Sequence, residues 1–440
     1  MNAPPLADGP AQALARAHER RLYLAARPLV YALARAAAWR GPLVSIPRVG
    51  HIVSSLPLAR EVLTAPERFA KTGPGALSDG LTGVMGRQAL VNMDGEPHRR
   101  LRGKLQGLFT PAYTAALVQR VLGPGLARLG ERLRRGERVD LALEAQAMTG
   151  RVACELLGVP LPPGREDATC IELHRLGAEF ASVLALDGGR PDARRLAAAR
   201  AQFEQLTQVA RVAFDQGDER CVPGRLRALG LDFEACRGVV GLLLLAGTET
   251  TASALPRIVA MLVDTGLWTR LRDDRALMPA ALDEGLRLTA AVPLMTRNVV
   301  APTRLGGRAL RQDDRVIVLL YNVLRTPAMG GAVLSLDRAR GADDAARDRA
   351  GGGTPVWFGL GPHFCLGAAL ARQEIEAALT VLLDAGALSI AARDHRSHGP
   401  LPAYGRLLVE GAPAAATSRR VAASARAPAA MNDDRSRAGR

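Results

Sequence analysis

The chain has 440 residues, of which 48% are hydrophobic and 4% aromatic, and its formal net charge at pH 7 is +15. This length and hydrophobic content suffice for one large globular domain or two of ordinary size. The basic residues are almost all arginine and are scattered, and no groove-reading motif or aromatic stacking platform accompanies them. We therefore do not expect nucleic-acid binding, although a basic patch could steer a small acidic protein partner.

The cysteines and the hydropathy pattern indicate the cellular compartment of the protein. The five cysteines are an odd number at irregular spacings without a CxxC pair, which favours a reducing cytoplasm over a disulfide framework. The longest uncharged part of the apolar segment near residue 240 covers residues 238–248, too short for a membrane span. The N-terminal RLYLAARPLVYALARAAAWR is interrupted by Arg27, Pro28 and Arg35, and predicts an amphipathic surface helix, neither a span nor a signal peptide.

Taken in chain order, the predicted elements are mostly helices. Short strands are expected at PLVSIP near residue 42 and at HIVSS from residue 51, then helices over 112–135, 193–215 and 233–265. Pro256 should kink or shorten the last of these helices. A strand at RVIVLL from residue 315 and a helix over 366–384 complete a mainly α fold with a minor β portion. We expect one domain over residues 1–410 and a disordered basic Ala/Arg-rich tail over 411–440.

Three segments place polar residues at helical spacing. MDGEPHRRLRGKL predicts a helix from about Pro97, with His98 and Arg102 four residues apart on one face. DEGLR places Glu284 and Arg287 three apart, which in isolation is usually a surface ion pair of little energetic weight. Each of these side chains, considered alone, is also compatible with a solvated surface.

The third segment, VVGLLLLAGTETTASAL at residues 239–255, is an apolar helix that turns polar at one point. Thr250 follows Ala246 by four residues, so its hydroxyl can donate to the Ala246 carbonyl and open the helix locally, with Gly247 easing the distortion. Glu249 is an acid beside it. Without further signals, these residues would be ordinary helix threonines and a solvated carboxylate.

The stretch WFGLGPHFCLGAALAR surrounds Cys365 with aromatics and glycines. Gly359 and Gly361 allow a tight turn, and a helical run follows, so the sulfur should lie near a helix N-terminus that favours a thiolate. A dinucleotide-binding turn is disfavoured because Phe364 stands at the third glycine position, and covalent haem attachment would need CxxCH. His363 and Cys365 make only one weak zinc pair. A single thiolate in an apolar loop suits the axial position of a haem iron.

FGLGPHFCLGAALA, residues 358–371, resembles the cysteine-ligand loop of the cytochrome P450 family. The resemblance implies that Cys365 is the proximal iron ligand, that Phe358 packs beside its sulfur, and that backbone amides around Gly367 donate to it. AGTETT resembles the oxygen-binding helix of the same family, which implies that Thr250 holds a proton-bearing network and Glu249 relays protons from solvent.

Further positions match the family pattern. D-x-x-x-H-x-x-x-R fits residues 94–102, and Arg297 in PLMTRNVV fits a further family position. The resemblance therefore implies four propionate-binding residues, namely His98, Arg102, Arg297 and His363. It also implies that Glu284 and Arg287 form a core pair that fixes the loop leading to the cysteine. The usual third partner of that pair is missing from GGAVLSLDRARG, where Arg338 is the candidate substitute.

The resemblance implies the cytochrome P450 fold, with heme b between the distal helix and the proximal cysteine loop. The expected function is a soluble, cytoplasmic haem-thiolate monooxygenase that uses O2 to hydroxylate or otherwise oxidise a hydrophobic small molecule, such as a terpenoid, polyketide or fatty-acyl compound. Because the sequence has no GxGxxG unit or reductase segment, electrons should come from a separate ferredoxin and its reductase. The implied substrate pocket consists of Leu242, Leu245, Ala246, Val292 and Leu294. The alternatives are another haem-thiolate oxidation, such as coupling or a peroxide-driven reaction, or a non-catalytic haem-binding protein.

Overall fold

A computed structural model describes residues 9–74, 76, 78–184, 193–338 and 355–412. The α-helices are α1 (Pro10–Ala26), α2 (Pro28–Arg40), α3 (Leu56–Thr64), α4 (Ser78–Met85), α5 (Gly95–Leu105), α6 (Pro111–Arg134), α7 (Leu141–Leu157), α8 (Glu166–Leu184), α9 (Ala193–Gln208), α10 (Arg211–Gln216), α11 (Val222–Ala228), α12 (Phe233–Asp264), α13 (Leu267–Asp273), α14 (Met278–Thr289), α15 (Leu320–Val323) and α17 (Ala368–Asp384). The strands are β1 (Leu43–Ile46), β2 (Gly50–Val53), β3 (Phe69–Ala70), β4 (Arg138–Asp140), β5 (Met295–Val299), β6 (Thr303–Leu305), β7 (Arg308–Leu310), β8 (Arg315–Val318), β9 (Ala387–His395) and β10 (Tyr404–Ala412).

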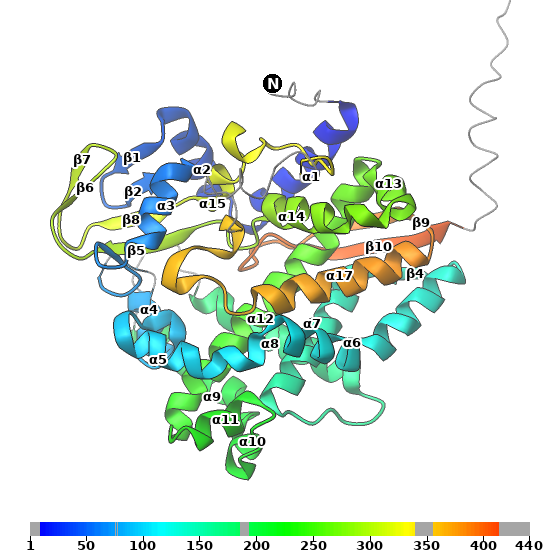
Figure 1. Cartoon of the computed structure of the whole chain (residues 1–440), viewed down its shortest axis with the longest axis horizontal. Coiled ribbons are helices and arrows are strands. Elements are labelled where there is room, and N and C mark those ends of the chain that lie inside the picture. Colours follow the sequence, from blue (N-terminus) through cyan, green and yellow to red (C-terminus); the bar gives the residue numbers. More distant parts are fainter. Residues whose placement is uncertain (1–8, 75, 77, 185–192, 339–354, 413–440) are drawn as a thin grey trace, which may run out of the picture.

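The strands form three sheets around a helical body. One sheet has the order β1-β2-β8-β5-β3, a second the order β4-β10-β9, and β6 pairs with β7. In the view of Figure 1 the first two sheets lie on opposite sides of the helices. Strands β2 and β8 run parallel, with His51 opposite Val316, whereas the other pairs are antiparallel. The chain is therefore mainly α with a minor β portion, as the sequence predicts.

The long helix α12 forms the centre of the fold. It packs against α7, α8, α14 and α17, and most of its residues are buried. By length and composition α12 could cross a membrane, with a mean hydropathy of 1.4 over its most apolar window, but 67% of that window is buried inside the protein. Core helices of this kind pass the same test, so the apolar character of α12 is explained by its place in the core.

Most of the predicted elements are confirmed, with shifts of a few residues. The helices predicted at 112–135, 233–265 and 366–384 correspond to α6, α12 and α17, and the three predicted strands correspond to β1, β2 and β8. The helix predicted at 193–215 is divided into α9 and α10. The single N-terminal helix is also two helices, because the backbone of Arg27 leaves the helical region at φ −149° before Pro28 begins α2.

Two expectations near element ends are corrected. Pro256 does not shorten α12, which continues to Asp264 with buried residues on either side of the proline. A kink at Pro256 stays a prediction. Strand β10 continues to Ala412, two residues into the predicted tail, because it pairs along its length with β9. Residues 413–440, the rest of that tail, lie outside the described residues.

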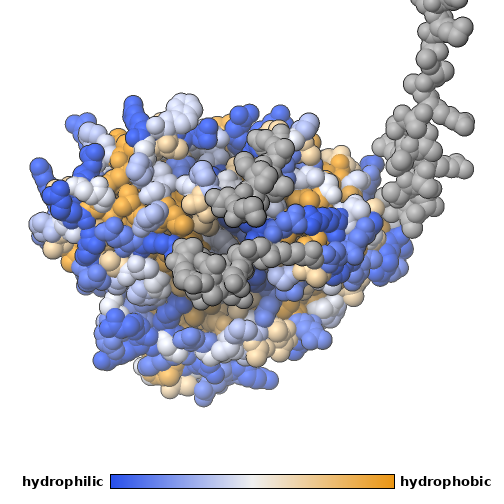
Figure 2. Space-filling model, turned by 45° about the horizontal axis from the view of Figure 1, so that its top comes forward, coloured by the Kyte–Doolittle hydropathy of each residue, from blue (hydrophilic) through white to orange (hydrophobic). Residues whose placement is uncertain are grey.

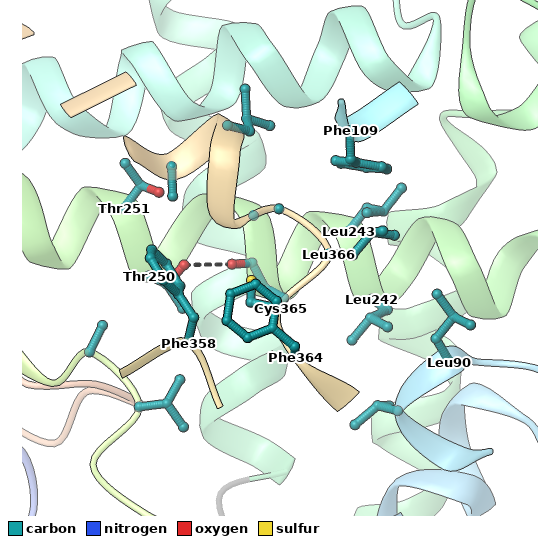
Figure 3. Close-up of a pocket in the computed structure, with 18 of the residues that line it drawn as sticks. Leu90, Phe109, Leu242, Leu243, Thr250, Thr251, Phe358, Phe364, Cys365 and Leu366 are labelled. Carbon is teal, nitrogen blue, oxygen red and sulfur yellow. Dashed lines mark hydrogen bonds between the residues drawn. The ribbon is translucent and has the colours of Figure 1, made fainter. Parts of the chain in front are cut away.

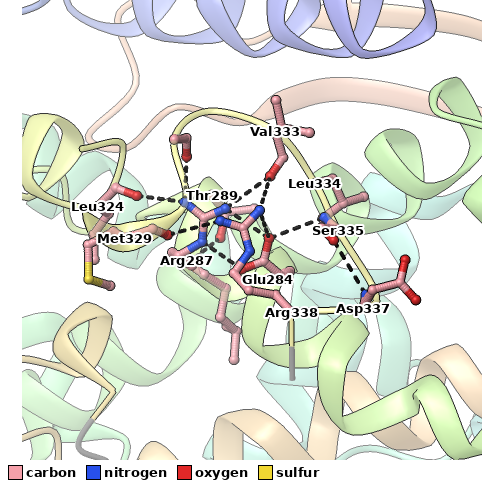
Figure 4. Close-up of polar contacts among 12 residues, drawn as sticks. Glu284, Arg287, Thr289, Leu324, Met329, Val333, Leu334, Ser335, Asp337 and Arg338 are labelled. Carbon is pink, nitrogen blue, oxygen red and sulfur yellow. Dashed lines mark hydrogen bonds and ion pairs between the residues drawn. The ribbon is translucent and has the colours of Figure 1, made fainter. Parts of the chain in front are cut away.

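A buried ion pair joins α14 to the segment that precedes the cysteine loop (Figure 4). Arg287 Nε donates to Glu284 Oε1 at 2.8 Å, and Arg287 Nη1 donates to the carbonyl oxygens of Leu324 and Gly331 at 2.6 and 2.7 Å. Arg338 Nη2 lies 3.4 Å from Glu284 Oε2. Arg338 therefore occupies the position of the missing third partner, and Glu284 and Arg287 lie in the core as expected.

The turn beneath Arg338 depends on one glycine. Gly330 has a φ of +91°, and a side chain at this position would collide with the guanidinium of Arg338. The same guanidinium donates to the carbonyl oxygens of Met329 and Val333. The low-complexity stretch that follows, residues 339–354, lies outside the described residues.

A second buried carboxyl lies where α17 packs on α12. Glu374 is 3% exposed, forms a hydrogen bond with Thr251, and burial raises its pKa to about 8. Ordinary buried carboxyls are paired with a cation, but Glu374 has only this hydroxyl among the groups that shift its pKa. It is therefore neutral at pH 7 in the folded protein.

We expect Arg287→Met to destabilise the fold by about 3–5 kcal/mol, because it leaves the Glu284 carboxylate buried without its cation. Arg372→Met is the matched control, since the ion pair of Arg372 with Asp283 is about one-third exposed and should be worth less than about 1 kcal/mol. Urea titration followed by far-UV circular dichroism measures both free energies of unfolding. Equal losses in the two variants would contradict the structural role of Arg287.

We expect Glu374→Gln to remove a pH dependence of stability. Between pH 4.5 and about 8 the unfolded chain releases the Glu374 proton and the folded chain keeps it, so stability falls as pH rises, by up to about 1.4 kcal/mol per pH unit. Below pH 4.5 both states hold the proton and this contribution is flat. Thermal unfolding from pH 5 to 8 checks the slope, with Glu376→Gln, an exposed residue of the same helix, as control. The same slope in wild type and Glu374→Gln would refute the prediction.

Candidate functional site

A cavity of ≈ 430 Å³ lies between α12 and the cysteine loop. Figure 3 labels Cys365 and Phe358 of the cysteine loop and Thr250 of α12 among the residues that line it. Most of its wall is apolar. The apolar lining residues include Leu90, Val91, Phe109, Val152, Ala153, Leu156, Leu242, Leu243, Val292 and Leu294.

The cysteine loop presents its sulfur to this cavity. Gly359 and Gly361 have positive φ values of +80° and +66°, which turn the chain so that the Cys365 amide donates to the Phe358 carbonyl oxygen at 2.9 Å. Two short 3₁₀ turns, Val356–Phe358 and Gly361–His363, complete the loop before α17 begins. Cys365 is exposed only in the sense that it faces the cavity, since protein atoms surround it on its other sides.

The environment of the thiol has opposing effects on its charge. Burial raises the pKa of Cys365, while a hydrogen bond from the Gly367 amide and the positive charges of Arg102 and Lys71 act to lower it, and the net shift is upward. The Phe358 ring packs against Phe364 at a centroid distance of 6.2 Å and an interplanar angle of 68°. All these groups line the cavity, so Phe358, Cys365 and Gly367 lie together as the sequence predicts.

Helix α12 supplies another part of the wall. Thr250 Oγ1 donates to the Ala246 carbonyl oxygen at 2.7 Å, the hydrogen bond expected from their spacing (Figure 3). Leu242, Ala246 and Thr250 share one face of the helix because they are four residues apart, and all three line the cavity. Val292 and Leu294 line it from the segment before β5.

Two predicted residues of α12 do not line the cavity. Leu245 packs against the main hydrophobic core without lining the cavity, whereas the neighbouring Leu243 does line it. Glu249 is 2% exposed and also lies off the cavity face. The reason is helical periodicity, because the cavity face of α12 holds positions 242, 243, 246, 247, 250, 251 and 254, and positions 245 and 249 are rotated by more than a quarter turn from the centre of that face.

The Glu249 carboxylate is held by two basic side chains from distant elements. His174 Nε2 on α8 lies 2.8 Å from Glu249 Oε1, and Arg396 Nη2 after β9 donates to Glu249 Oε2 at 2.7 Å. Burial alone would raise the pKa of Glu249, but the hydrogen bond from His174 and the charge of Arg396 hold it below its ordinary value. Glu249 is therefore an ionised carboxylate behind the cavity wall.

One end of the cavity is basic. The lining includes His98 and Arg102 of α5, Arg297 of β5 and His363 of the cysteine loop, the four predicted residues, together with Lys71. The His98 and His363 rings lie 4.2 Å apart between centroids.

Asp94 is the one carboxylate among the described residues that shift the pKa values of these basic side chains. Asp94 Oδ1 lies 2.8 Å from His363 Nε2, and Asp94 Oδ2 accepts hydrogen bonds from the amide and hydroxyl of Thr72, each at 2.7 Å. The predicted propionate-binding His363 is therefore also paired with Asp94. The proton donor is the imidazole, because an ionised carboxylate can only accept.

The pKa values of the basic residues at this end are lowered first by burial and then, for His98 and Lys71, by neighbouring positive charge. Burial, followed by repulsion from neighbouring cations, lowers the pKa of His98 to about 4, of Lys71 to about 8 and, by burial alone, of Arg297 to about 10. Buried cations are costly unless an anion pairs with them. An apolar cavity with a thiol on one wall and cations at one end fits a flat, largely apolar group that carries two carboxylates.

Sequence reasoning missed four residues of this region. Lys71 lies in a turn-rich segment, where its type and position give no periodic signal, and the partners His174 and Arg396 are 75 and 147 residues from Glu249. Glu374 lies on α17, nine residues after Cys365, and is buried. Helical spacing along α17 could have predicted that its side chain faces the core.

Comparison with known proteins identifies the family. The family model for cytochrome P450 matches residues 269–395. Cytochrome P450-SU2 of Streptomyces griseolus is 32% identical over 337 residues, which cover 74% of this chain and 77% of that protein. The 20-oxo-5-O-mycaminosyltylactone 23-monooxygenase of Streptomyces fradiae is 28% identical over 80% of this chain and 79% of its own length.

Solved structures share the fold. P450BioI, in complex with an acyl carrier protein bearing hexadec-9Z-enoic acid, matches with a TM-score of 0.71 and 21% identity, covering 88% of this chain and 99% of that one. A mutant of P450 EryK in complex with erythromycin B matches with a TM-score of 0.69 and 24% identity, covering 86% and 95%. On the fold, the family match and the identity to P450-SU2 together, this chain belongs to the cytochrome P450 family and is a haem-thiolate monooxygenase.

Proposed function

We propose that this monooxygenase hydroxylates or otherwise oxidises a bulky, largely apolar small molecule, with Cys365 as the axial ligand of its haem iron. One observation carries the proposal: Cys365 of the cysteine loop and Thr250 of α12 line the same apolar cavity. The first is the ligand that the family chemistry requires, and the second is a proton-bearing group on the wall of the same cavity.

We assign heme b as the cofactor and five side chains as the holders of its propionates. These are Lys71, His98, Arg102, Arg297 and His363, which line one end of the cavity. At pH 7, two propionates, with the Asp94 carboxylate and the cysteine thiolate, would balance the charges of Lys71, Arg102 and Arg297 and the single positive charge of ferric porphyrin. The charge balance supports a dicarboxylate rather than a neutral cofactor.

Bound haem supplies iron-centred activation of O2. The Cys365 thiolate would bind the iron, and the Gly367 amide would stabilise the sulfur's negative charge by hydrogen bonding. The ring of Phe358 keeps water from the sulfur. Ala246 of α12 would contact the macrocycle from the other side.

Thr250 would hold a proton at the site of O2 activation. Its hydroxyl hydrogen is engaged with the Ala246 carbonyl, so its oxygen lone pairs remain able to accept a hydrogen bond from a water in the cavity. Glu249 lies behind this wall, and it would relay protons only when its side chain leaves His174 or Arg396 and turns toward Thr250. In this proposal, the two partners control when the relay is connected.

The apolar wall supports a substrate such as a terpenoid, polyketide or fatty-acyl compound. Leucine, valine and alanine side chains from α7 and α12 form part of it, and few polar groups are present to orient a hydrophilic molecule. The names of two relatives are compatible with this class, since one acts on a mycaminosyltylactone and one solved structure holds erythromycin B.

Electrons would come from an external ferredoxin and its reductase. Residues 1–410 would form a single catalytic domain, and the protein would act in the cytoplasm, with the remaining residues as a basic tail. The exposed Arg99, Arg100 and Lys104 of α5 support docking of an acidic donor, although Glu96 pairs with both arginines. Full turnover of the isolated chain with NADPH alone would exclude this arrangement.

The reduced, carbon-monoxide-bound absorption spectrum tests the axial ligand. We expect the wild-type protein to show the Soret band of thiolate-ligated haem, and Cys365→His to lose it because imidazole replaces the thiolate. Cys221→Ala is the control, since Cys221 is buried away from the cavity and should leave the spectrum unchanged. A thiolate spectrum in Cys365→His would show that another residue is the ligand.

We expect Thr250→Ala to uncouple the reaction, so that product formed per O2 consumed falls by about tenfold while O2 consumption continues. Thr248→Ala is a matched control, because Thr248 makes the same kind of hydrogen bond to the carbonyl oxygen four residues before it but does not line the cavity. Oxygen uptake and product yield measure the coupling. If both variants uncouple equally, the effect belongs to the helix and not to the Thr250 hydroxyl.

A further inference from the structure

Helix α2 is apolar on the side that faces solvent as well as on the side that faces the protein. Its inner side is fixed by Ala34 and Ala37, which pack on Ile52 and Leu319, and by a hydrogen bond from Asn322 Nδ2 to the Ala34 carbonyl oxygen at 2.8 Å. The partly buried Tyr31 ring packs edge-on against Tyr321. The inward surface of the helix is thereby occupied.

The outward surface carries large hydrophobic side chains at helical spacing. Leu29, Leu33, Ala36 and Trp39 lie at intervals of three or four residues, which places them on one stripe, and Val30 borders it. Leu29 is 78% and Trp39 80% exposed. Of the ten exposed large hydrophobic residues in the part of the chain that the structure describes, six lie in α1 and α2. Figure 2 shows hydrophobic surface on the side where Figure 1 places α2.

The exposed charges of residues 10–60 are all positive. Residues 10–60 contain eight arginines and one acidic residue, Glu19. Glu19 is buried and paired with Arg257, so it contributes no exposed negative charge. On α2 itself Arg35 and Arg40 are exposed, and the Arg35 guanidinium lies 5.8 Å from the centroid of the Trp39 ring.

We propose that this stripe is a peripheral docking surface for an anionic lipid bilayer, with α2 lying in the plane of the interface. Leucine and tryptophan on one face of a helix flanked by arginines are the composition of interfacial helices, in which the apolar face enters the headgroup region and the cations meet lipid phosphates. The long arginine stems allow their charged ends to reach the phosphates while Leu29 and Leu33 enter the apolar layer.

A second copy of the chain fits this surface less well than lipid does. Pairing two α2 helices through their stripes would bring Arg35 and Arg40 of each copy together, and the described residues from 10 to 60 offer no exposed carboxylate to neutralise them. An anionic lipid surface satisfies both the apolar stripe and the positive charge.

Co-sedimentation of the full-length holoprotein with vesicles tests the proposal. Vesicles of phosphatidylcholine with 30–40% phosphatidylglycerol should bind the wild-type chain, and Leu29→Ser combined with Leu33→Ser should weaken the partition coefficient by about tenfold or more. Leu143→Ser combined with Val212→Ser is the control, because these residues are 46% and 57% exposed on other elements. Unchanged binding in the α2 variant would overturn the proposal, and would also be the result if only the basic tail binds.

A second measurement uses the wild-type chain and is independent of variant folding. Trp39 fluorescence should be quenched by lipids brominated in the upper acyl chain, whereas Trp268, 3% exposed, should not contribute to that quenching.

Arg35→Gln combined with Arg40→Gln should weaken binding and reduce its salt dependence. Equal binding to pure phosphatidylcholine, or a dimer by light scattering that is lost in the Leu29/Leu33 variant without any vesicle binding, would refute a lipid surface as the partner.

Discussion

Excess positive charge at one end of the cavity is the constraint on which this site depends. Burial lowers the pKa of Lys71, Arg102 and Arg297, and the Asp94 carboxylate opposes this shift at Lys71 and Arg297. Such an arrangement is unfavourable in a chain without its cofactor, because desolvation of a charge is repaid only by a paired ion. A group with two carboxylates therefore stabilises the folded state when it binds, by mass action on the folded form.

The same balance of burial and charge gives two buried carboxyls on neighbouring helices opposite protonation states. Glu249 has His174 and Arg396 as partners and stays ionised, whereas Glu374 has a threonine hydroxyl and burial keeps it protonated near neutral pH. One is a fixed negative charge behind the cavity wall, and the other is a neutral group on that wall. Environment rather than residue type thus decides which carboxyl can hold a proton here.

Sequence was sufficient where function requires a local pattern, and insufficient where it requires distant partners. Helical spacing predicts the Thr250 hydrogen bond to Ala246. The cysteine loop and the core position of the Glu284–Arg287 pair are local patterns whose roles the resemblance to cytochrome P450 implied. Leu245 was misplaced because a run of four leucines gives no contrast from which to choose the cavity face. The partners of Glu249 come from α8 and from the end of β9, and no spacing rule connects elements so far apart.

The apolar pattern of the N-terminal helices is interpreted differently once the structure shows which side of α2 packs against the protein. From sequence, RLYLAARPLVYALARAAAWR predicts an amphipathic surface helix, and the pattern does not say which of its apolar side chains face the protein. In the structure the alanines face inward, because Ala34 and Ala37 are small enough for α2 to lie close to the sheet that contains β2 and β8. Leu29, Leu33 and Trp39 must then point outward. Large apolar side chains at helical spacing on the outer side of α2 can be buried only by something beyond the described part of the chain.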